Sequence, residues 1–257
     1  MRNVLAIAGK ELGAYFHSPI AYLVMTVWSF LCGFVFYQYS GAYATASLRR
    51  AMSGMSVPFP TINEFIIRNM LQGFLMVVLL LVVPLITMRL YAEEKKSGTI
   101  ELLLTSPLTD FEIILGKYLS ALALFGTLVA LTFLYFSLLF IYGNPDAKPL
   151  LANALGLLLY GGALLALGMW ISTFTKNQII AGAVAMVLFL ILYILFWPSE
   201  ISFSPVTQVL SYLSFSPHLD NFGKGVIDLT DVVYFLSAIV LGLFLTARSV
   251  DALKGRP

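Results

Sequence analysis

The hydrophobic positions of this chain gather into long runs without a charged residue, and the polar positions lie between them. Five runs occupy residues 18–48, 69–88, 118–145, 149–175 and 177–199. Each is about as long as, or longer than, the roughly 20 apolar residues that cross a bilayer as a helix. A sixth run, 232–247, has only 16 residues, so it spans only if Asp231 and Arg248 lie at the two interfaces. The pattern predicts six transmembrane helices, at 20–39, 69–88, 117–141, 151–174, 179–197 and 232–248.

Residues 1–18 are amphipathic rather than continuously apolar. An apolar stripe recurs at helical spacing and consists of Leu5, Ala8, Leu12, Tyr15 and Phe16. Arg2 and Lys10 fall largely off this stripe. A helix of this kind lies in the membrane surface, and Pro19 would end it. The alternative is that the first span begins here with a frayed polar end.

The segment 89–116 is the longest cytoplasmic interval between the predicted spans, and it carries the densest charge of the chain. Gly98 with Glu101 resembles a helix N-cap, and Pro107 would stop that helix, so we predict a short helix over 99–105. Its apolar side chains are Ile100, Leu102, Leu103 and Leu104. A helix this apolar in a water-facing loop needs a cover. Either it folds back onto the bilayer surface, or it fills a groove in a partner protein.

A second helix start follows within the same segment. Thr109 and Glu112 have the spacing of a capping box, and Leu108 with Ile113 supplies the matching hydrophobic staple. We therefore expect a helix that begins here and runs through Lys117 into the third span.

The segment 198–231 precedes the last span and contains proline at 198, 205 and 217. Apolar stripes begin at Pro205 and at Pro217, which predicts two short helices hinged at 215–217. This pair dips into the outer leaflet and returns, or it rests on the bilayer as a plain hairpin. The residues that we single out in it are Leu210, Leu213, Phe222, Gly223 and Asp228. In contrast, residues 40–68 predict an outward loop with at most one surface helix.

Composition and charge support a membrane protein and set its orientation. The chain is 60% hydrophobic and only 11% charged, against about 25% charged in ordinary soluble domains. With the N-terminus in the cytoplasm, the cytoplasmic basic residues are Arg2, Lys10, Arg89, Lys95, Lys96, Lys117, Lys176, Arg248, Lys254 and Arg256. The outward ones are Arg49, Arg50, Arg68, Lys148 and Lys224. Ten against five favours both termini in the cytoplasm.

The residues present argue against several kinds of chemistry. No Gly-Lys pair continues into a nucleotide-binding loop, so we expect no ATP site and no bound cofactor in this chain. One cysteine and two distant histidines predict no metal site, and a net charge of +2 does not favour nucleic acid. Spans one to five show no interior carboxylate, histidine or lysine, which disfavours ion-coupled transport. We expect no catalytic residues.

Several motifs resemble those of a known family. They are K-E-L-x-x-Y-F-x-S-P-I at 10–20, M-R-L-Y-A-E-E-K-K-S-G-T-I-E-L-L-L-T-S-P-L at 88–108, and L-G-K-Y at 115–118. Together they resemble the permease subunits of type-2 ABC exporters. N-Q-I-I-A at 177–181 and G-V-I-D-L-T-D at 225–231 look most like the gliding-motility-associated branch. The resemblance covers nearly the whole chain in order.

The resemblance implies an all-α, single-domain polytopic fold, residues 1–257, with an elbow helix, six spans, a coupling helix in loop 89–116 and re-entrant outer helices in 198–231. It implies a bacterial inner-membrane exporter of two permease protomers, here a homodimer, and two ATPase subunits that bind ATP and Mg. A membrane-anchored extracytoplasmic subunit is plausible in this branch. The expected ATPase-coupling residues are Glu93, Glu94, Gly98, Thr99, Ile100, Glu101, Leu102, Leu103, Leu104 and Thr105. The rival function is an ATPase-docked anchor that transmits conformational work without transport.

Overall fold

The fold is a bundle of long helices, seen in a computed structural model that describes residues 2–53, 59–100, 108–143, 145–202 and 204–254. No strand occurs among these residues. Six of the described helical stretches are long and apolar enough to cross a membrane. They are α2 (Pro19–Ser53), η1 (Asn63–Leu75) continued by α3 (Met76–Thr87), α6 (Asp110–Tyr142), α7 (Ala147–Ser172), α8 (Gln178–Ile194) and α12 (Leu229–Lys254). The predicted all-α, six-span class is confirmed.

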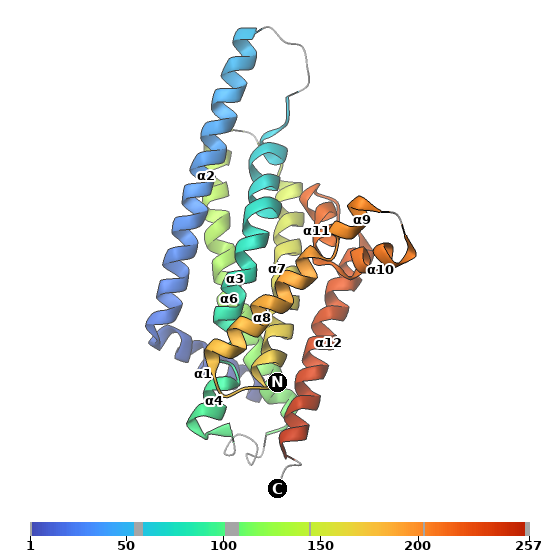
Figure 1. The fold of residues 1–257 in the computed structure, drawn as a ribbon. Helices are drawn as coiled ribbons and strands as arrows, with labels where there is room; N and C mark the ends of the chain where they lie inside the picture. Colours follow the sequence, from blue (N-terminus) through green and yellow to red (C-terminus); the bar gives the residue numbers. More distant parts are fainter. Residues whose placement is uncertain (1, 54–58, 101–107, 144, 203, 255–257) are drawn as a thin grey trace.

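The first membrane helix is much longer than the sequence pattern suggested. α2 has 35 residues and extends about 50 Å, against a hydrocarbon core of about 30 Å. Our prediction that 40–68 is mainly a loop was therefore wrong for residues 40–53, and it was also wrong for residues 63–68, which belong to η1. Hydroxyl side chains in this part of α2 donate hydrogen bonds to backbone carbonyls of the preceding helical turn. Thr45 Oγ1, for example, donates to Gly41 O at 3.0 Å. Figure 1 shows the end of α2 rising beyond the neighbouring helices.

α7 is the central helix of the bundle. It is buried along most of its length, and it packs against α3, α6, α8 and α12. The contact with α12 is close because Gly242 has no side chain: a Cβ there would lie 2.7 Å from the backbone carbon of Ala166. α6 approaches in the same way, since the ring of Phe125 occupies the space beside Gly161. Small residues thus set the spacing of the core helices.

The predicted N-terminal helix is present as α1 (Arg2–His17). Figure 1 shows it lying across the foot of the bundle, at a steep angle to α2. It packs on α6, where Gly116 leaves room for Ile7. Tyr15, a member of the predicted stripe, is buried, whereas Leu5 is 68% exposed. The stripe therefore serves partly as a packing face.

Three short helices form the outer end before the last span: α9 (Trp197–Ile201), α10 (Pro205–Leu213) and α11 (Phe215–Gly223). α10 begins at Pro205 as predicted, behind a capping box of Ser204 and Thr207. α11 begins earlier than predicted, at Phe215, because Ser214 is its N-cap. Pro217 then falls in the first helical turn, where a missing backbone N–H costs no helical hydrogen bond.

A buried hydrogen-bonded pair fastens this outer segment to α12. His218 Nδ1 lies 2.7 Å from Asp231 Oδ1, and His218 Nε2 lies 3.0 Å from Tyr212 O. Asn221 Nδ2 donates to the other Asp231 oxygen at 2.8 Å. Asp231, which we expected at a membrane interface, is only 5% exposed because these neighbours cover it.

We expect His218→Phe to weaken the packing of the outer segment. Phenylalanine keeps a ring beside Tyr234 but leaves Asp231 buried with one hydrogen bond fewer, which costs about 1–3 kcal/mol. That loss lowers the melting temperature in detergent by about 5 °C. The same substitution at exposed His17 should change the melting temperature little. Equal melting of the two variants would contradict a stabilising role for the hydrogen bond between His218 and Asp231.

The arrangement of the ends also makes the topology testable. α1 and the C-terminal end of α12 lie at the same end of the bundle (Figure 1). With the ten-to-five basic bias, this predicts that a reporter fused after Pro257 is active in the cytoplasm. A reporter inserted near Asp146 should be active on the outer side. A C-terminal reporter found outside would overturn the N-in, C-in assignment.

Candidate functional site

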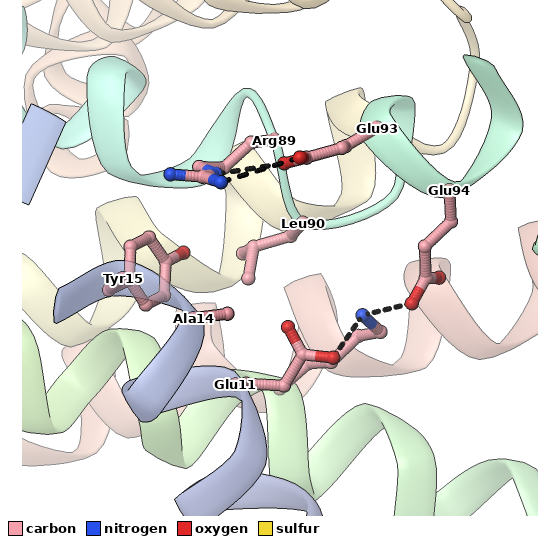
Figure 2. Close-up of a pocket in the computed structure, with 8 residues that line it drawn as sticks. Glu11, Ala14, Tyr15, Arg89, Leu90, Glu93 and Glu94 are labelled. Atoms are coloured by element: carbon pink, nitrogen blue, oxygen red, sulfur yellow. Dashed lines mark hydrogen bonds and ion pairs between the residues drawn. The ribbon is translucent and has the colours of Figure 1, made fainter. Parts of the chain in front are cut away.

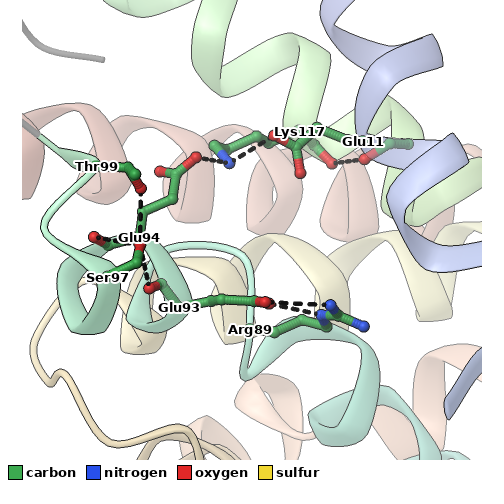
Figure 3. Close-up of polar contacts among 8 residues, drawn as sticks. Glu11, Arg89, Glu93, Glu94, Ser97, Thr99 and Lys117 are labelled. Atoms are coloured by element: carbon green, nitrogen blue, oxygen red, sulfur yellow. Dashed lines mark hydrogen bonds and ion pairs between the residues drawn. The ribbon is translucent and has the colours of Figure 1, made fainter. Parts of the chain in front are cut away.

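A lysine is buried where α1, α4 (Ala92–Ser97) and α6 meet. The side chain of Lys117 is 1% exposed. Its Nζ lies 3.0 Å from Glu11 Oε1 on α1 and 2.7 Å from Glu94 Oε1 on α4. Figure 3 shows the ammonium held between the two carboxylates. Burial of an unpaired ammonium would be prohibitive, so this ion triad ties the three helices together.

A second polar layer lies beside the ion triad. Arg89 Nε donates to Glu93 Oε2 at 2.9 Å, and its guanidinium lies 5.4 Å from the centre of the Tyr15 ring. The Tyr15 hydroxyl donates to Ile86 O at 2.9 Å. Burial raises the pKa of this hydroxyl well above its ordinary value, so it remains a neutral donor. α1 is therefore fastened to the end of α3 as well as to α6.

The two layers enclose a small cavity of about 110 Å³ (Figure 2). Its walls combine acidic and basic groups, among them Glu11, Arg89, Glu94 and Lys117. Nearby, Arg89 Nη1, Glu94 Oε2 and the Tyr91 hydroxyl are buried without a hydrogen-bond partner in the part of the chain that the structure describes. Unpaired buried polar atoms are costly. The junction thus retains hydrogen-bonding capacity beyond its internal contacts.

The structure corrects the role of Gly98. This glycine ends α4 as a left-handed C-cap at φ +75°, and it does not begin a helix as an N-cap. A positive φ strains any residue with a side chain, which is why glycine occupies this position. Ser97 Oγ and Thr99 Oγ1 are 2.8 Å apart just across the cap. α4 and its glycine cap thus lead directly into the segment that we expected to couple to a partner.

Most of the coupling helix that we predicted over 99–105 falls outside the described residues. Residues 101–107 lie outside the described part of the chain, so Glu101, Leu102, Leu103, Leu104 and Thr105 keep the status of a prediction. Thr99 is exposed, and Ile100 is half-buried against the core. The Thr109–Glu112 capping box that starts α6 is confirmed. Glu93 and Glu94 both have internal partners, Arg89 and Lys117.

The outer candidate residues do not form one site. Phe222 and Gly223 are buried, with the Phe222 ring filling the space beside Gly156 of α7. Leu210 is half-buried, Leu213 is 49% exposed, and Asp228 is exposed. These residues lie in neighbouring elements but do not come together in one site. The outer residues that do come together are charged residues of α11 and η1.

A charged cluster joins α11 to η1. Arg68 Nη2 lies 2.6 Å from Asp220 Oδ1, and Lys224 pairs with the other Asp220 oxygen. Burial acts to raise the pKa of Asp220, but the hydrogen bonds from Lys224 and Arg68 outweigh it and the pKa is lowered. Gln72 Nε2 also donates to Leu219 O at 2.6 Å. These contacts hold the outer helices against the second span.

The sequence alone did not predict that Lys117 pairs with Glu11 and Glu94, or that His218 pairs with Asp231. Lys117 stood at the edge of a predicted span, and Glu11 and Glu94 lay in two other segments. The available signal was the position of these charged residues at the predicted membrane edges, because ionisable groups that become buried there pair with one another.

No group of three or more metal-binding side chains occurs among the described residues.

We expect Lys117→Met to destabilise the chain because it leaves two partly buried carboxylates without their cation. The loss is about 1.5–3 kcal/mol, which lowers the melting temperature in detergent by about 5 °C. Adding Glu94→Gln should recover part of the loss, because one stranded charge is removed. The matched control is Lys96→Met at an exposed position of α4, which should melt near wild type. Identical melting of both single variants would mean that the ion triad stabilises nothing.

Comparison with known proteins agrees with these features. No curated protein matches the chain. A family model described as ABC-2 family transporter protein matches residues 5–239, which include most of α1, the ion triad and the first part of α12. On this match, the chain belongs to the ABC-2 family of transporter membrane proteins.

Proposed function

We propose that this chain is a permease subunit of an ATP-driven exporter, which forms the membrane path and couples to a separate ATPase. The family assignment supports a permease. The observation that carries the coupling is the ion triad, which fastens α4 to both α1 and α6 immediately before the apolar segment 99–105. A force on that segment would reach three helices at once.

The proposed mechanism begins at the Gly98 cap. ATP binding closes an ATPase dimer and displaces residues 99–105, which pull on α4. Glu94 transmits the displacement to Lys117 on α6, and Lys117 transmits it to Glu11 on α1. Glu94 Oε2 and Arg89 Nη1 are buried without partners among the described residues. The displacement of α4 would expose them for polar contacts with the ATPase. ATP and Mg would be bound by the ATPase alone.

The proposed assembly contains two copies of this chain and two ATPase subunits. We place it in a bacterial inner membrane with both termini in the cytoplasm, and we assign it to the gliding-motility-associated branch on segments 177–181 and 225–231. In this orientation the outer end of α2 stands above the bilayer, with Tyr43, Phe59 and Phe65 gathered beside it. That end is a suitable contact for a membrane-anchored extracytoplasmic subunit.

The same outward extension favours the second candidate function, an anchor that transmits work to an outer partner without moving cargo. The two functions differ in the response of the assembly to compounds. Cargo should alter the rate of ATP hydrolysis by a transporter. An anchor should hydrolyse ATP at a rate that no compound changes but that removal of the outer partner does.

The docking of segment 99–105 predicts a loss of ATPase association in Leu103→Asp. The substitution buries an unpaired carboxylate at the contact, which costs several kcal/mol, and each 1.4 kcal/mol is about tenfold in affinity. The ATPase should therefore no longer copurify, while the permease should still insert. Leu48→Asp, the same change at an exposed position on the outer end of α2, should leave copurification intact. Wild-type yield of ATPase with Leu103→Asp would remove the docking assignment.

A further inference from the structure

A cavity of about 350 Å³ lies between the second span and the outer helices. Its walls come from the junction of η1 and α3, from the turn between α8 and α9, and from α9, α10 and α11. These three short helices gather at the outer end of the bundle (Figure 1). Pockets that bind small molecules have volumes of about 300–1,000 Å³ and combine an apolar wall with a few polar groups. This cavity is therefore large enough for a small ligand.

Two serine hydroxyls on the cavity wall are free. Ser211 of α10 and Ser216 of α11 are half-buried, and neither hydroxyl has a hydrogen-bond partner in the described part of the chain. A third, Ser199 of α9, donates to Phe196 O at 2.6 Å, which leaves its oxygen lone pairs as acceptors. Each free hydroxyl can both donate and accept. The wall thus presents three hydroxyl groups to a ligand.

Gln72 adds an amide that is held in one orientation. Its Oε1 accepts from Arg68 Nε at 3.1 Å, and its Nε2 donates to Leu219 O at 2.6 Å. An amide nitrogen carries two hydrogens, so one N–H donor remains. A side chain at Gly223 would collide with this amide, so the glycine makes room for it. The donor is therefore oriented before any ligand binds.

The cavity offers no unpaired charge to a ligand. Asp220 is the one charged side chain among the described residues that line it, and its two oxygens already pair with Arg68 and Lys224. Neither of these cations is part of the cavity wall. A charged ligand would lose hydration here without gaining an ionic partner. The cavity therefore favours a neutral ligand.

The remainder of the wall is apolar and consists of Met76, Phe196, Pro217 and Leu219. A ligand that fits both parts of the wall has several hydroxyl groups and a surface of C–H groups. A sugar ring has this arrangement, with hydroxyls around its edge and C–H groups on its faces. An extended peptide is a poorer match, because such peptides pair with the edge of a sheet, and the described residues include no strand.

We propose that this cavity binds a neutral saccharide. Ser211, Ser216 and Gln72 form hydrogen bonds with the ring hydroxyls, and Met76 and Phe196 contact the C–H groups. The cavity lies at the opposite end of the bundle from the ion triad (Figure 1). The proposal does not depend on coupling to an ATPase, so it can be tested with the full-length chain alone.

The test is a titration of the full-length chain in a detergent without a sugar headgroup, read by saturation-transfer NMR of the ligand. The neutral probes are the methyl glycosides of glucose, galactose, mannose and N-acetylglucosamine. Glucuronate tests the effect of charge, and a blocked alanine tripeptide tests a peptide ligand. We expect at least one glycoside to bind, and glucuronate to bind at least about tenfold more weakly than that glycoside, because its carboxylate loses hydration.

Three results would overturn the proposal. They are binding of none of the glycosides, equal affinity for glucuronate, and tighter binding of the tripeptide than of any glycoside. The last result would assign the cavity to a peptide segment of a partner protein.

Serine variants locate the site. Ser211→Ala and Ser216→Ala should each weaken binding of the tightest glycoside about fivefold, which corresponds to one neutral hydrogen bond. The melting temperature without ligand should stay the same, because neither hydroxyl has an internal partner to lose. Ser137→Ala, at an exposed position of α6, is the matched control and should bind like wild type. If both cavity variants also bind like wild type, the saccharide site is not in this cavity.

Discussion

The structure depends on the need to pair a charged amine that is buried at the foot of the bundle. Lys117 has almost no contact with solvent, and its ammonium is acceptable there only because two carboxylates flank it. Those carboxylates belong to α1 and α4, so the pairing adds a polar contact to the apolar packing of α1 on α6. It also fixes α4, the short helix before segment 99–105, to α6.

Close helix packing imposes a second constraint, centred on α7. Glycine at 161 and 242 lets α6 and α12 approach until side chains fill the space that a Cβ would need. α8 also packs on α7, and side chains of α7, α8 and α12 together line a cavity of about 320 Å³.

The two ends of the bundle use charge in different ways. At the foot, Glu94 Oε2 of the ion triad and the nearby Arg89 Nη1 have no hydrogen-bond partner among the described residues. At the outer end, His218, Asp231 and Asn221 satisfy one another, and Asp220 is held by two cations. A saturated network fixes the outer helices against α12 and η1, whereas an incomplete one remains open to a further contact.

The sequence by itself determined the class of the protein and the number of its spans, because the bilayer imposes length and polarity on each helix separately. It also determined local features that depend on neighbouring residues, such as the Thr109 capping box and the end of α1 near Pro19. It did not reveal that α2 continues to Ser53, because the sequence of residues 40–53 is compatible with either a loop or a helix. Nor did it reveal that Gly98 ends a helix, because glycine occurs at both N-caps and C-caps. Only the tertiary structure decided that Lys117 meets Glu11 and Glu94, that α7 is central, and that a cavity lies beside it. These features join segments far apart in the chain, and all the spans are too similarly apolar for their order of packing to be read from composition.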